Sequence, residues 1–317
     1  MRRRLAALAG ALTLAFSPSV AAAPTGDLAL LQQRDAQLFS IGWRLARANA
    51  PYCRETVPAI GMLLHDVSAY DDPAATRAAL GLSGDIGVQA VAPDSPAEAA
   101  GLRANATFAA INGATMADIP PSQPRWERLA MLQDRIDAEL AVPAQIGWTG
   151  PGGTLHSEQI APVPVCRTRF EVLSSGSRAL AEGSRVIFGR DFPGFAYVED
   201  EFAAAVAHEL AHNLLGHRAQ LDAEGRTRSR IRLTEREADR LMPWLLYNAG
   251  YDPRAAVRFM RRWGPRHGGG LFRKRTHDGW DERVEFITAE IEAMGQVIGE
   301  TGAADWSRHF RRETGPD

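Results

Sequence analysis

The sequence predicts an α+β protein, with a mainly helical C-terminal unit that has a small β-sheet and an inserted unit rich in strands. Residues 80–165 hold short alternating apolar segments separated by turn residues, which is typical of strands. Beyond residue 200, apolar side chains recur with helical spacing in four successive segments. A length of 317 residues and a hydrophobic content of 45% allow a core for each unit.

The chain divides into four expected regions. These are an export signal over 1–22, an N-terminal helical segment over 23–79, the β-rich unit over 80–165 and the C-terminal unit over 166–317. We expect the N-terminal helical segment to pack on the C-terminal unit. A formal net charge of −2 without any basic block argues against nucleic acid as a partner.

The first residues have the features of an export signal. Three arginines, Arg2 to Arg4, precede an apolar run from Leu5 to Phe16, and small residues follow. That run is too short to span a bilayer, and no later segment is apolar enough to do so. We therefore expect cleavage after Ala22 and a mature chain without a transmembrane segment. Its expected location is the periplasm of a Gram-negative bacterium, or otherwise the secreted fraction.

Two cysteines, Cys53 and Cys166, bracket the β-rich unit. An even number of cysteines in an exported chain favours a disulfide, and two cysteines allow only one connectivity. Two free buried thiols are the alternative. A bond between them would tie together the two connections of the inserted unit.

The elements before and inside the inserted unit follow from local signals. Pro51 ends a first helix over 27–50, and Ser95 with Pro96 has the pattern of an N-cap followed by proline at the first helical position. The remaining elements are a strand or short helix near 61–67, a helix over 73–80, strands over 87–91 and 108–111, a turn at Asn112-Gly113, a helix over 125–140 and a turn over 150–153.

Two segments of this unit resemble the PDZ domains of bacterial proteases. They are S-P-A-E-A-A-G-L at Ser95–Leu102 and A-I-N-G at Ala110–Gly113. The resemblance implies that a loop of the type Leu80-Gly81-Leu82 presents backbone N–H groups to the carboxylate of a peptide C-terminus. The adjacent sheet edge would then accept the peptide as an added strand. A packing module that binds no ligand is the alternative, because a fold alone does not give function.

In the C-terminal unit, strands are expected over 170–173 and 185–188. Four helices are expected over 200–217, 235–248, 253–263 and 281–298. The charged segment 218–233 between the first two helices is expected to form a lid over the site or, equally, a disordered connector.

The pattern H-E-x-x-H occurs at His208-Glu209-Leu210-Ala211-His212. Positions i and i+4 lie on one side of a helix, so both imidazoles can reach the same metal ion. Glu209 projects beside them and can take a proton from the attacking water. The alternative is a helix that matches the pattern by coincidence.

A catalytic zinc ion needs a third protein ligand and one open position. Glu235 and Asp239 are four residues apart in an expected helix and share a face. Glu235 can therefore bind the metal while Asp239 orients an imidazole from outside. Glu237 is expected on the opposite side, in a capping box that starts at Thr234. A solvated acidic first turn is the alternative for this segment.

Three motifs together resemble metallopeptidase family forty-eight, the HtpX and CAAX prenyl endopeptidase type of gluzincin. They are H-E-L-A-H-N-L-L-G-H at His208–His217, E-R-E-A-D at Glu235–Asp239 and A-G-Y-D-P at Ala249–Pro253. The resemblance implies a zincin-type domain with one Zn²⁺ per chain, Glu235 as third ligand and Asp239 as its supporting carboxylate. It also implies that His277 and Arg283 stabilise the oxyanion of the tetrahedral intermediate. The resemblance implies that His217 is a packing histidine, or one that supports a ligand from outside, rather than a ligand itself.

The expected function is zinc-dependent hydrolysis of polypeptide substrates among exported or envelope proteins, in protein quality control. The strand over 185–188 is expected beside the cleft, where it pairs with an extended substrate. A PDZ-bearing binding or chaperone protein on a metal-stabilised scaffold is the rival interpretation. A hydrolase of non-peptide bonds that uses the same zinc site is a third.

Overall fold

The computed structural model describes residues 25–116, 119–267 and 278–314. These residues form both helices and β-sheets, so the chain has the α+β class expected from its sequence. The expected export signal lies outside the described residues. Within the described chain, no helix is long and apolar enough to cross a membrane.

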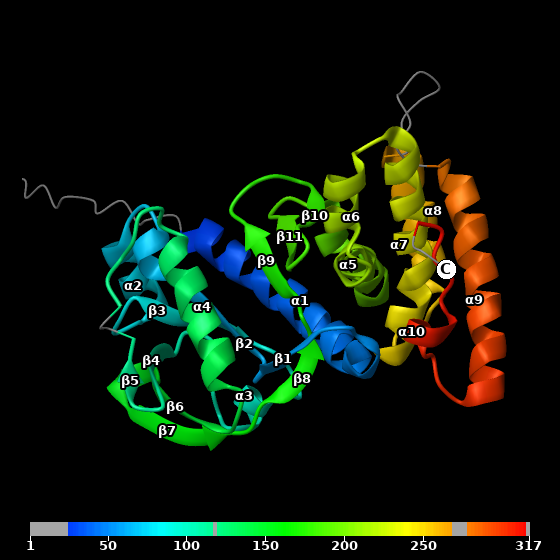
Figure 1. Cartoon of the computed structure of the whole chain (residues 1–317). Helices are drawn as coiled ribbons and strands as arrows, with labels where there is room; N and C mark the ends of the chain where they lie inside the picture. Colours follow the sequence, from blue (N-terminus) through cyan, green and yellow to red (C-terminus); the bar gives the residue numbers. More distant parts are fainter. Residues whose placement is uncertain (1–24, 117–118, 268–277, 315–317) are drawn as a thin grey trace, which may run out of the picture.

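Helix α1 (Thr25–Asn49) runs between a sheet unit and a helical unit (Figure 1). Its predicted apolar face is buried at Leu38, Ile41 and Leu45, which belong to the core of the helical unit. The same helix contacts strand β3 of the sheet unit and strands β8 and β9. It therefore packs on both units.

The sheet unit, residues 60–160, is an antiparallel sheet in the order β2-β3-β4-β6-β7, with β5 paired to β4. Its strands are β2 (Met62–Asp66), β3 (Ile86–Val91), β4 (Thr107–Ile111), β5 (Ala114–Thr115), β6 (Ala144–Thr149) and β7 (Leu155–Ile160). Its helices are η2 (Val67–Ala69), α2 (Pro73–Leu80), α3 (Pro96–Ala99), α4 (Glu127–Glu139) and η3 (Pro151–Gly153). As predicted, Ser95 caps α3, where its Oγ accepts the N–H of Glu98 at 3.1 Å.

The sheet unit begins earlier than the expected boundary at residue 80. Strand β2 pairs with β3 along its whole length, and Ile60 and Leu64 are buried in the same core as Phe108 and Ile146. The expected N-terminal segment is thus divided: α1 packs largely on the helical unit, whereas residues 60–79 complete the sheet unit.

The helical unit contains a three-stranded sheet in the order β10-β11-β9, and strands β1 and β8 pair separately. The strands are β1 (Thr56–Ala59), β8 (Val163–Cys166), β9 (Arg169–Leu173), β10 (Ala179–Ala181) and β11 (Arg185–Gly189). The helices are η1 (Ala50–Tyr52), η4 (Pro193–Ala196), α5 (Glu199–Leu214), α6 (His217–Glu224), α7 (Arg228–Asn248), α8 (Ala255–His267), α9 (Trp280–Thr301) and α10 (Trp306–His309). Phe188, Phe202 and Trp244 lie in its core.

Two expectations for this unit are wrong. The segment 218–233 is not a disordered connector, because it forms most of α6 and the start of α7, while its action as a lid stays a prediction. Strand β11 cannot pair with a substrate strand, because it lies between β10 and β9 and pairs with both. The edges of this sheet are β10 and β9.

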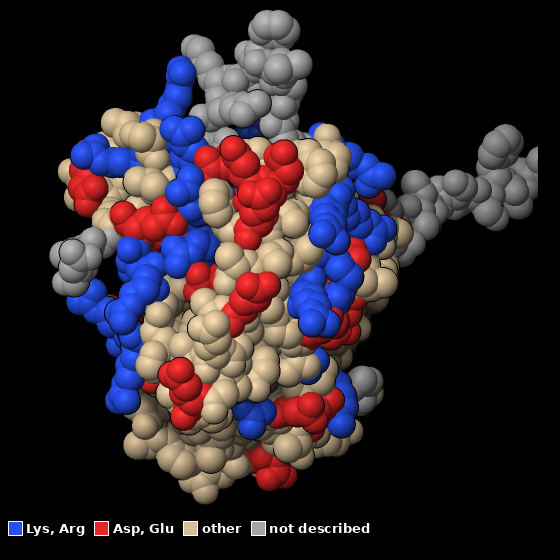
Figure 2. All heavy atoms as spheres, turned by 90° about the vertical axis from the view of Figure 1, so that its right-hand side faces the viewer, with Lys and Arg blue, Asp and Glu red and all other residues tan. Residues whose placement is uncertain are grey.

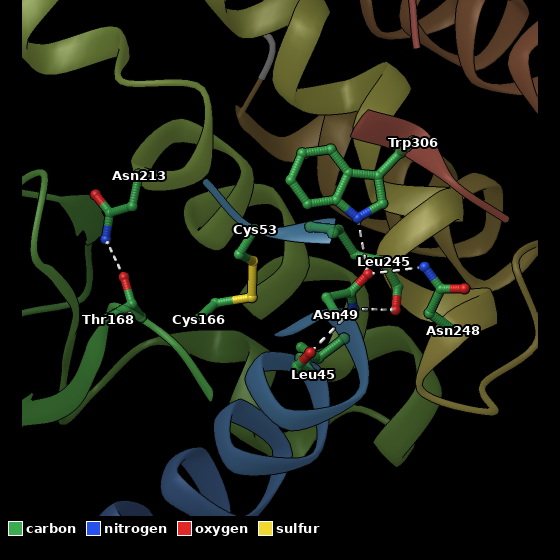
Figure 3. Close-up of a disulfide and its surroundings, with 9 residues drawn as sticks. All are labelled: Leu45, Asn49, Cys53, Cys166, Thr168, Asn213, Leu245, Asn248 and Trp306. Carbon is green, nitrogen blue, oxygen red and sulfur yellow. Dashed lines mark hydrogen bonds between the residues drawn. A yellow bond between two sulfur atoms is a disulfide. The ribbon is translucent and has the colours of Figure 1, made fainter. Parts of the chain in front are cut away.

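The predicted disulfide between Cys53 and Cys166 is present (Figure 3). Close to it, the fully buried side chain of Asn49 joins the end of α1 to two other helices. Its amide donates to the carbonyls of Leu45 and Leu245, and its carbonyl accepts from Asn248 and Trp306, all at 2.9–3.1 Å. The bond and this network together hold the N-terminal helix against the helical unit.

Acidic and basic side chains interleave on the side of the molecule where α9 lies (Figure 2). Arg240, for example, pairs with both Glu290 and Glu313 there. This face therefore carries both signs of charge, consistent with the composition.

Asp35 of α1 connects the two units from a buried position. Its carboxylate accepts the side-chain N–H of Gln89 in β3 at 2.8 Å and the backbone N–H of Val172 in β9 at 3.0 Å. Burial raises its pKa from 3.8 to about 6, although both hydrogen bonds favour the charged form. The carbonyl oxygen of Gln89 is buried without a hydrogen-bond partner in the described chain.

We predict that Asp35→Asn stabilises the protein increasingly between pH 4 and pH 6. A native pKa above the unfolded value means that the native state keeps a proton the unfolded state has lost, so wild-type stability falls as pH rises through this window. The neutral amide avoids this loss, and its N–H can donate to Gln89 once that amide is flipped. The difference in unfolding free energy should grow by about 1.4 kcal/mol per pH unit and level off above pH 6. Denaturant unfolding across this range measures it, and a difference independent of pH would contradict it.

Candidate metal centre

Helix α5 positions His208, Glu209 and His212. It begins with three acidic residues, which the positive end of the helix dipole favours. Its opposite face is fully buried at Phe202, Val206 and Leu210, which fixes the rotation of the helix. The H-E-x-x-H residues therefore lie on its half-buried side.

Helix α7 packs against α5 and brings Glu235 to the two imidazoles. Its carboxylate oxygens lie 3.3 Å from Nε2 of His208 and 3.5 Å from Nε2 of His212. The two Nε2 atoms are 3.3 Å apart. The side chains are 12%, 14% and 17% exposed, so the cluster is shielded but reachable from solvent.

These three groups can hold a metal ion. Ligands about 2.0–2.1 Å from a tetrahedral zinc ion are about 3.3–3.4 Å from one another. The two Nε2 atoms are 3.3 Å apart, and one Glu235 oxygen lies 3.3 Å from His208 while the other lies 3.5 Å from His212, so the donor atoms are close to that geometry. Two imidazoles and one carboxylate also leave a fourth position open.

Asp239 and Arg283 support the cluster from the side of His208. Asp239 is fully buried and accepts two hydrogen bonds from the Arg283 guanidinium, at 2.5 and 2.7 Å. Its Oδ1 lies 3.1 Å from Nδ1 of His208, a short contact whose direction is not that of an aligned hydrogen bond. Asp239 therefore lies beside His208, one of the candidate ligands, and its role as a supporting carboxylate stays a prediction.

The net negative charge of the carboxylates around this cluster favours binding of a cation. Burial alone would lower the pKa of His208, yet contacts with Asp239 and Glu235 raise it to about 10. Burial lowers the pKa of the neighbouring His212 to about 3. Two carboxylates next to one guanidinium thus attract one more positive charge, which a proton on His208 or a bound metal ion can supply.

The roles of the other predicted catalytic residues stay predictions. Arg283 is buried against Asp239, and its action on an oxyanion stays a prediction. His277 lies outside the described residues. Glu209 is half-buried on α5, between the two ligand histidines in sequence, and its role as a base also stays a prediction.

Glu237 was expected in a capping box, and this is wrong. Helix α7 starts at Arg228 with Thr227 as its cap, so Glu237 lies inside the helix. It is fully buried and accepts hydrogen bonds from His217, Arg312, Glu313 and Thr314. Although burial alone would raise its pKa, the hydrogen bonds from His217 and Arg312 lower it to about 2.

The predicted carboxylate loop Leu80-Gly81-Leu82 does not have the expected geometry. It forms the C-terminal end of α2, where the N–H of Gly81 donates to Ala78 and that of Leu82 donates to Arg77. These amides are therefore committed to ending a helix. They are not directed at a ligand.

A groove beside an edge strand, where a peptide could add to the sheet, lies between the sheet unit and the helical unit. A cavity of about 280 Å³ is bounded by Ile60-Gly61-Met62, by the edge strand β2 and by α4. Gly61 has a φ of +80°, and a Cβ there would lie 2.2 Å from Cβ of Ser95, so only glycine fits. The far wall comes from α1 and β9, where Arg169 pairs with Asp134 and Asp137 of α4.

Comparisons with known proteins leave the family open. No protein-family model and no curated protein matches this sequence. The resemblance to metallopeptidase family forty-eight therefore depends on the three quoted motifs.

We predict that Glu237→Ala destabilises the protein by about 3–5 kcal/mol, the usual cost of removing one partner of a buried charged network. The capping-box role that the sequence analysis gave to Glu237 would instead lead to a loss of only about 1 kcal/mol. Since the native pKa is about 2 against 4.5 unfolded, the stabilisation is present above pH 4.5 and is lost as the pH falls towards 2. The penalty of the substitution should shrink over the same window.

Denaturant unfolding of the purified mature chain measures this penalty. Glu285→Ala on the exposed side of α9 is the control, and we expect its effect to stay within about 0.5 kcal/mol. A cost of 1 kcal/mol or less for Glu237→Ala would show that the buried network contributes no more than a cap.

Proposed function

We propose that this protein is a zinc-dependent endopeptidase of the gluzincin type, related to metallopeptidase family forty-eight. The observation that carries the proposal is the convergence of His208, His212 and Glu235 at zinc-like separations of 3.3–3.5 Å. Glu209 adjoins this cluster on α5, in the arrangement that H-E-x-x-H gives to a general base.

In the proposed mechanism, His208, His212 and Glu235 would hold a Zn²⁺ ion, which would supply a Lewis acid for the scissile carbonyl and would make the attacking water more acidic. Glu209 removes a proton from the attacking water and later delivers it to the leaving amine. Asp239 holds the His208 imidazole and is itself held by Arg283. His277 and Arg283 retain their proposed role at the oxyanion, as the family resemblance implies.

An extended substrate is best accommodated along β10. This strand pairs with β11 on one side only, so its other edge is unpaired in the described chain. Strand β10 also contacts α5, and the N–H of Gly183 just after it donates to Asn213 of α5 at 2.7 Å. The substrate backbone would add to this edge as a further strand next to the metal cluster.

The proposed setting is the exported compartment, where the enzyme acts on envelope or secreted polypeptides in protein quality control. The disulfide and the lack of a membrane-crossing helix in the described chain are compatible with export. In this setting the PDZ-like groove between β2 and α4 would hold a peptide C-terminus while the chain is cut elsewhere.

The groove also favours a second candidate, a binding or chaperone protein on a metal-stabilised scaffold. Its edge strand and apolar lining suit strand addition without any chemistry. The two candidates differ at Glu209, since a purely structural metal site has no need of a base. A non-peptide hydrolase would use the same base and differ only in its substrate.

We predict that Glu209→Gln retains zinc while losing catalysis, and that Glu235→Ala loses both. Removal of a general base typically costs about 10²–10⁴-fold in rate. Removal of a ligand leaves only two imidazoles, which under-coordinate the ion. Zinc content by mass spectrometry and turnover of unfolded casein would be measured for the mature chain and both variants.

The control is Glu201→Ala, a carboxylate at the start of the same helix that pairs with Arg262, away from the metal cluster. It should retain both zinc and turnover. Zinc binding without cleavage of any unfolded polypeptide would instead favour the binding protein. Cleavage that survives in Glu209→Gln would exclude the proposed mechanism.

A further inference from the structure

His217 is buried next to the metal cluster but is not one of its ligands. It is 1% exposed and starts helix α6, five residues after His212. Its Nδ1 lies 2.8 Å from Nδ1 of His212, and its Nε2 lies 2.9 Å from Oε2 of Glu237. One imidazole thus joins a metal-site histidine to a buried carboxylate.

The other partners of Glu237 determine which atom holds the proton in each contact. Its two oxygens accept from the Arg312 guanidinium, the backbone N–H groups of Glu313 and Thr314, and the Thr314 hydroxyl. The carboxylate is therefore surrounded by donors and acts only as an acceptor. Nε2 of His217 must carry the proton that it shares with Glu237.

The remaining contact joins two ring nitrogens and needs one donor and one acceptor. A neutral His217 protonated at Nε2 offers a lone pair at Nδ1, so the hydrogen must be on Nδ1 of His212. That tautomer leaves Nε2 of His212 unprotonated, facing His208 and Glu235.

We propose that Arg312–Thr314, Glu237 and His217 form a positioning relay that holds His212 in the tautomer and orientation needed to bind the metal. The inference rests on the proposed function and deepens it, because it makes metal affinity depend on a segment about a hundred residues away from α5 in the chain.

The segment 312–314 is well placed for this role. The Arg312 guanidinium donates to the carbonyl of Leu215 at 2.9 Å and to the side chain of Gln220 at 3.2 Å, besides Glu237. Arg312 therefore hydrogen-bonds to the end of α5, to α6 and to α7, the three elements that surround His217. His208 is next to Asp239, whose partner is Arg283 of α9, so the two candidate ligand histidines depend on different guanidiniums although both carboxylates belong to α7.

The test measures Zn²⁺ affinity of the metal-free mature chain by competition with a chromophoric chelator. We expect His217→Leu to weaken the affinity about 10–100-fold, the usual effect of removing the partner of a metal-binding histidine. His217→Asn should recover most of this loss, since Asn Oδ1 occupies nearly the position of His Nδ1 and can accept from His212. A residue that acted only in packing would give the opposite order, because leucine suits a buried site better than asparagine.

A second pair of variants tests the C-terminal segment. Arg312→Ala should weaken Zn²⁺ binding several-fold or more, whereas Arg311→Ala, an exposed neighbour in the same segment, should leave it unchanged. Circular dichroism of each metal-free variant establishes that it is folded. Equal Zn²⁺ affinity for His217→Leu, Arg312→Ala and the wild type would overturn the relay.

The tautomers are measured directly by nitrogen-15 NMR of the histidine side chains in the metal-free protein. We expect the hydrogen on Nδ1 in His212 and on Nε2 in His217, and a change of the His212 tautomer in His217→Leu. The reverse assignment in the wild type would overturn the relay even if the variants bind weakly. A wild-type chain that binds no Zn²⁺ at all would count against the proposed function itself, so the two failures are distinguishable.

Discussion

Helix α7 carries three carboxylates, Glu235, Glu237 and Asp239, within one turn and a half. Its packing against α5 encloses this part of the helix. Buried charge is stable only when it is paired, and leaving a single carboxylate unpaired costs several kcal/mol. Asp239 has Arg283 as its partner, and Glu237 has Arg312 with His217. Glu235 faces two imidazoles, so its charge is matched by a proton or by a metal ion.

This constraint explains why distant parts of the chain meet at the site. Arg283 comes from α9 and Arg312 from the segment after α10, and neither is near the H-E-x-x-H motif in sequence. Both guanidiniums are directed inward, and each makes more than one hydrogen bond to its carboxylate or to neighbouring carbonyls. The stability of the helical unit and the geometry of the metal cluster therefore depend on the same interactions.

The sheet unit is joined to the helical unit by contacts of a different kind. Asp35 bridges α1, β3 and β9 through two hydrogen bonds, and the Cys53–Cys166 bond closes the two connections. Arg169 of β9 pairs with Asp134 and Asp137 of α4 at the wall of the groove. The groove is therefore bounded by both units, and a peptide held there would contact the helical unit as well.

Local sequence determined the class of the fold, most element positions and the core of the site. Periodicity and caps predicted α1, α2 and α3. The four-residue spacing of His208 and His212 predicted that both imidazoles reach one metal ion. Both kinds of signal act within one or two helical turns, so local sequence contains them. The start of α7 was missed because Thr234 and Glu237 imitate a capping box, whereas the helix is extended backward to Arg228. The loop at Gly81, the edge strand β10 and the partners of His217 and Glu237 were decided only by tertiary structure. Strand order and long-range ion pairs join residues more than a hundred positions apart, such as Thr56 with Cys166 and Asp27 with Arg190, and no local sequence pattern predicts such pairings.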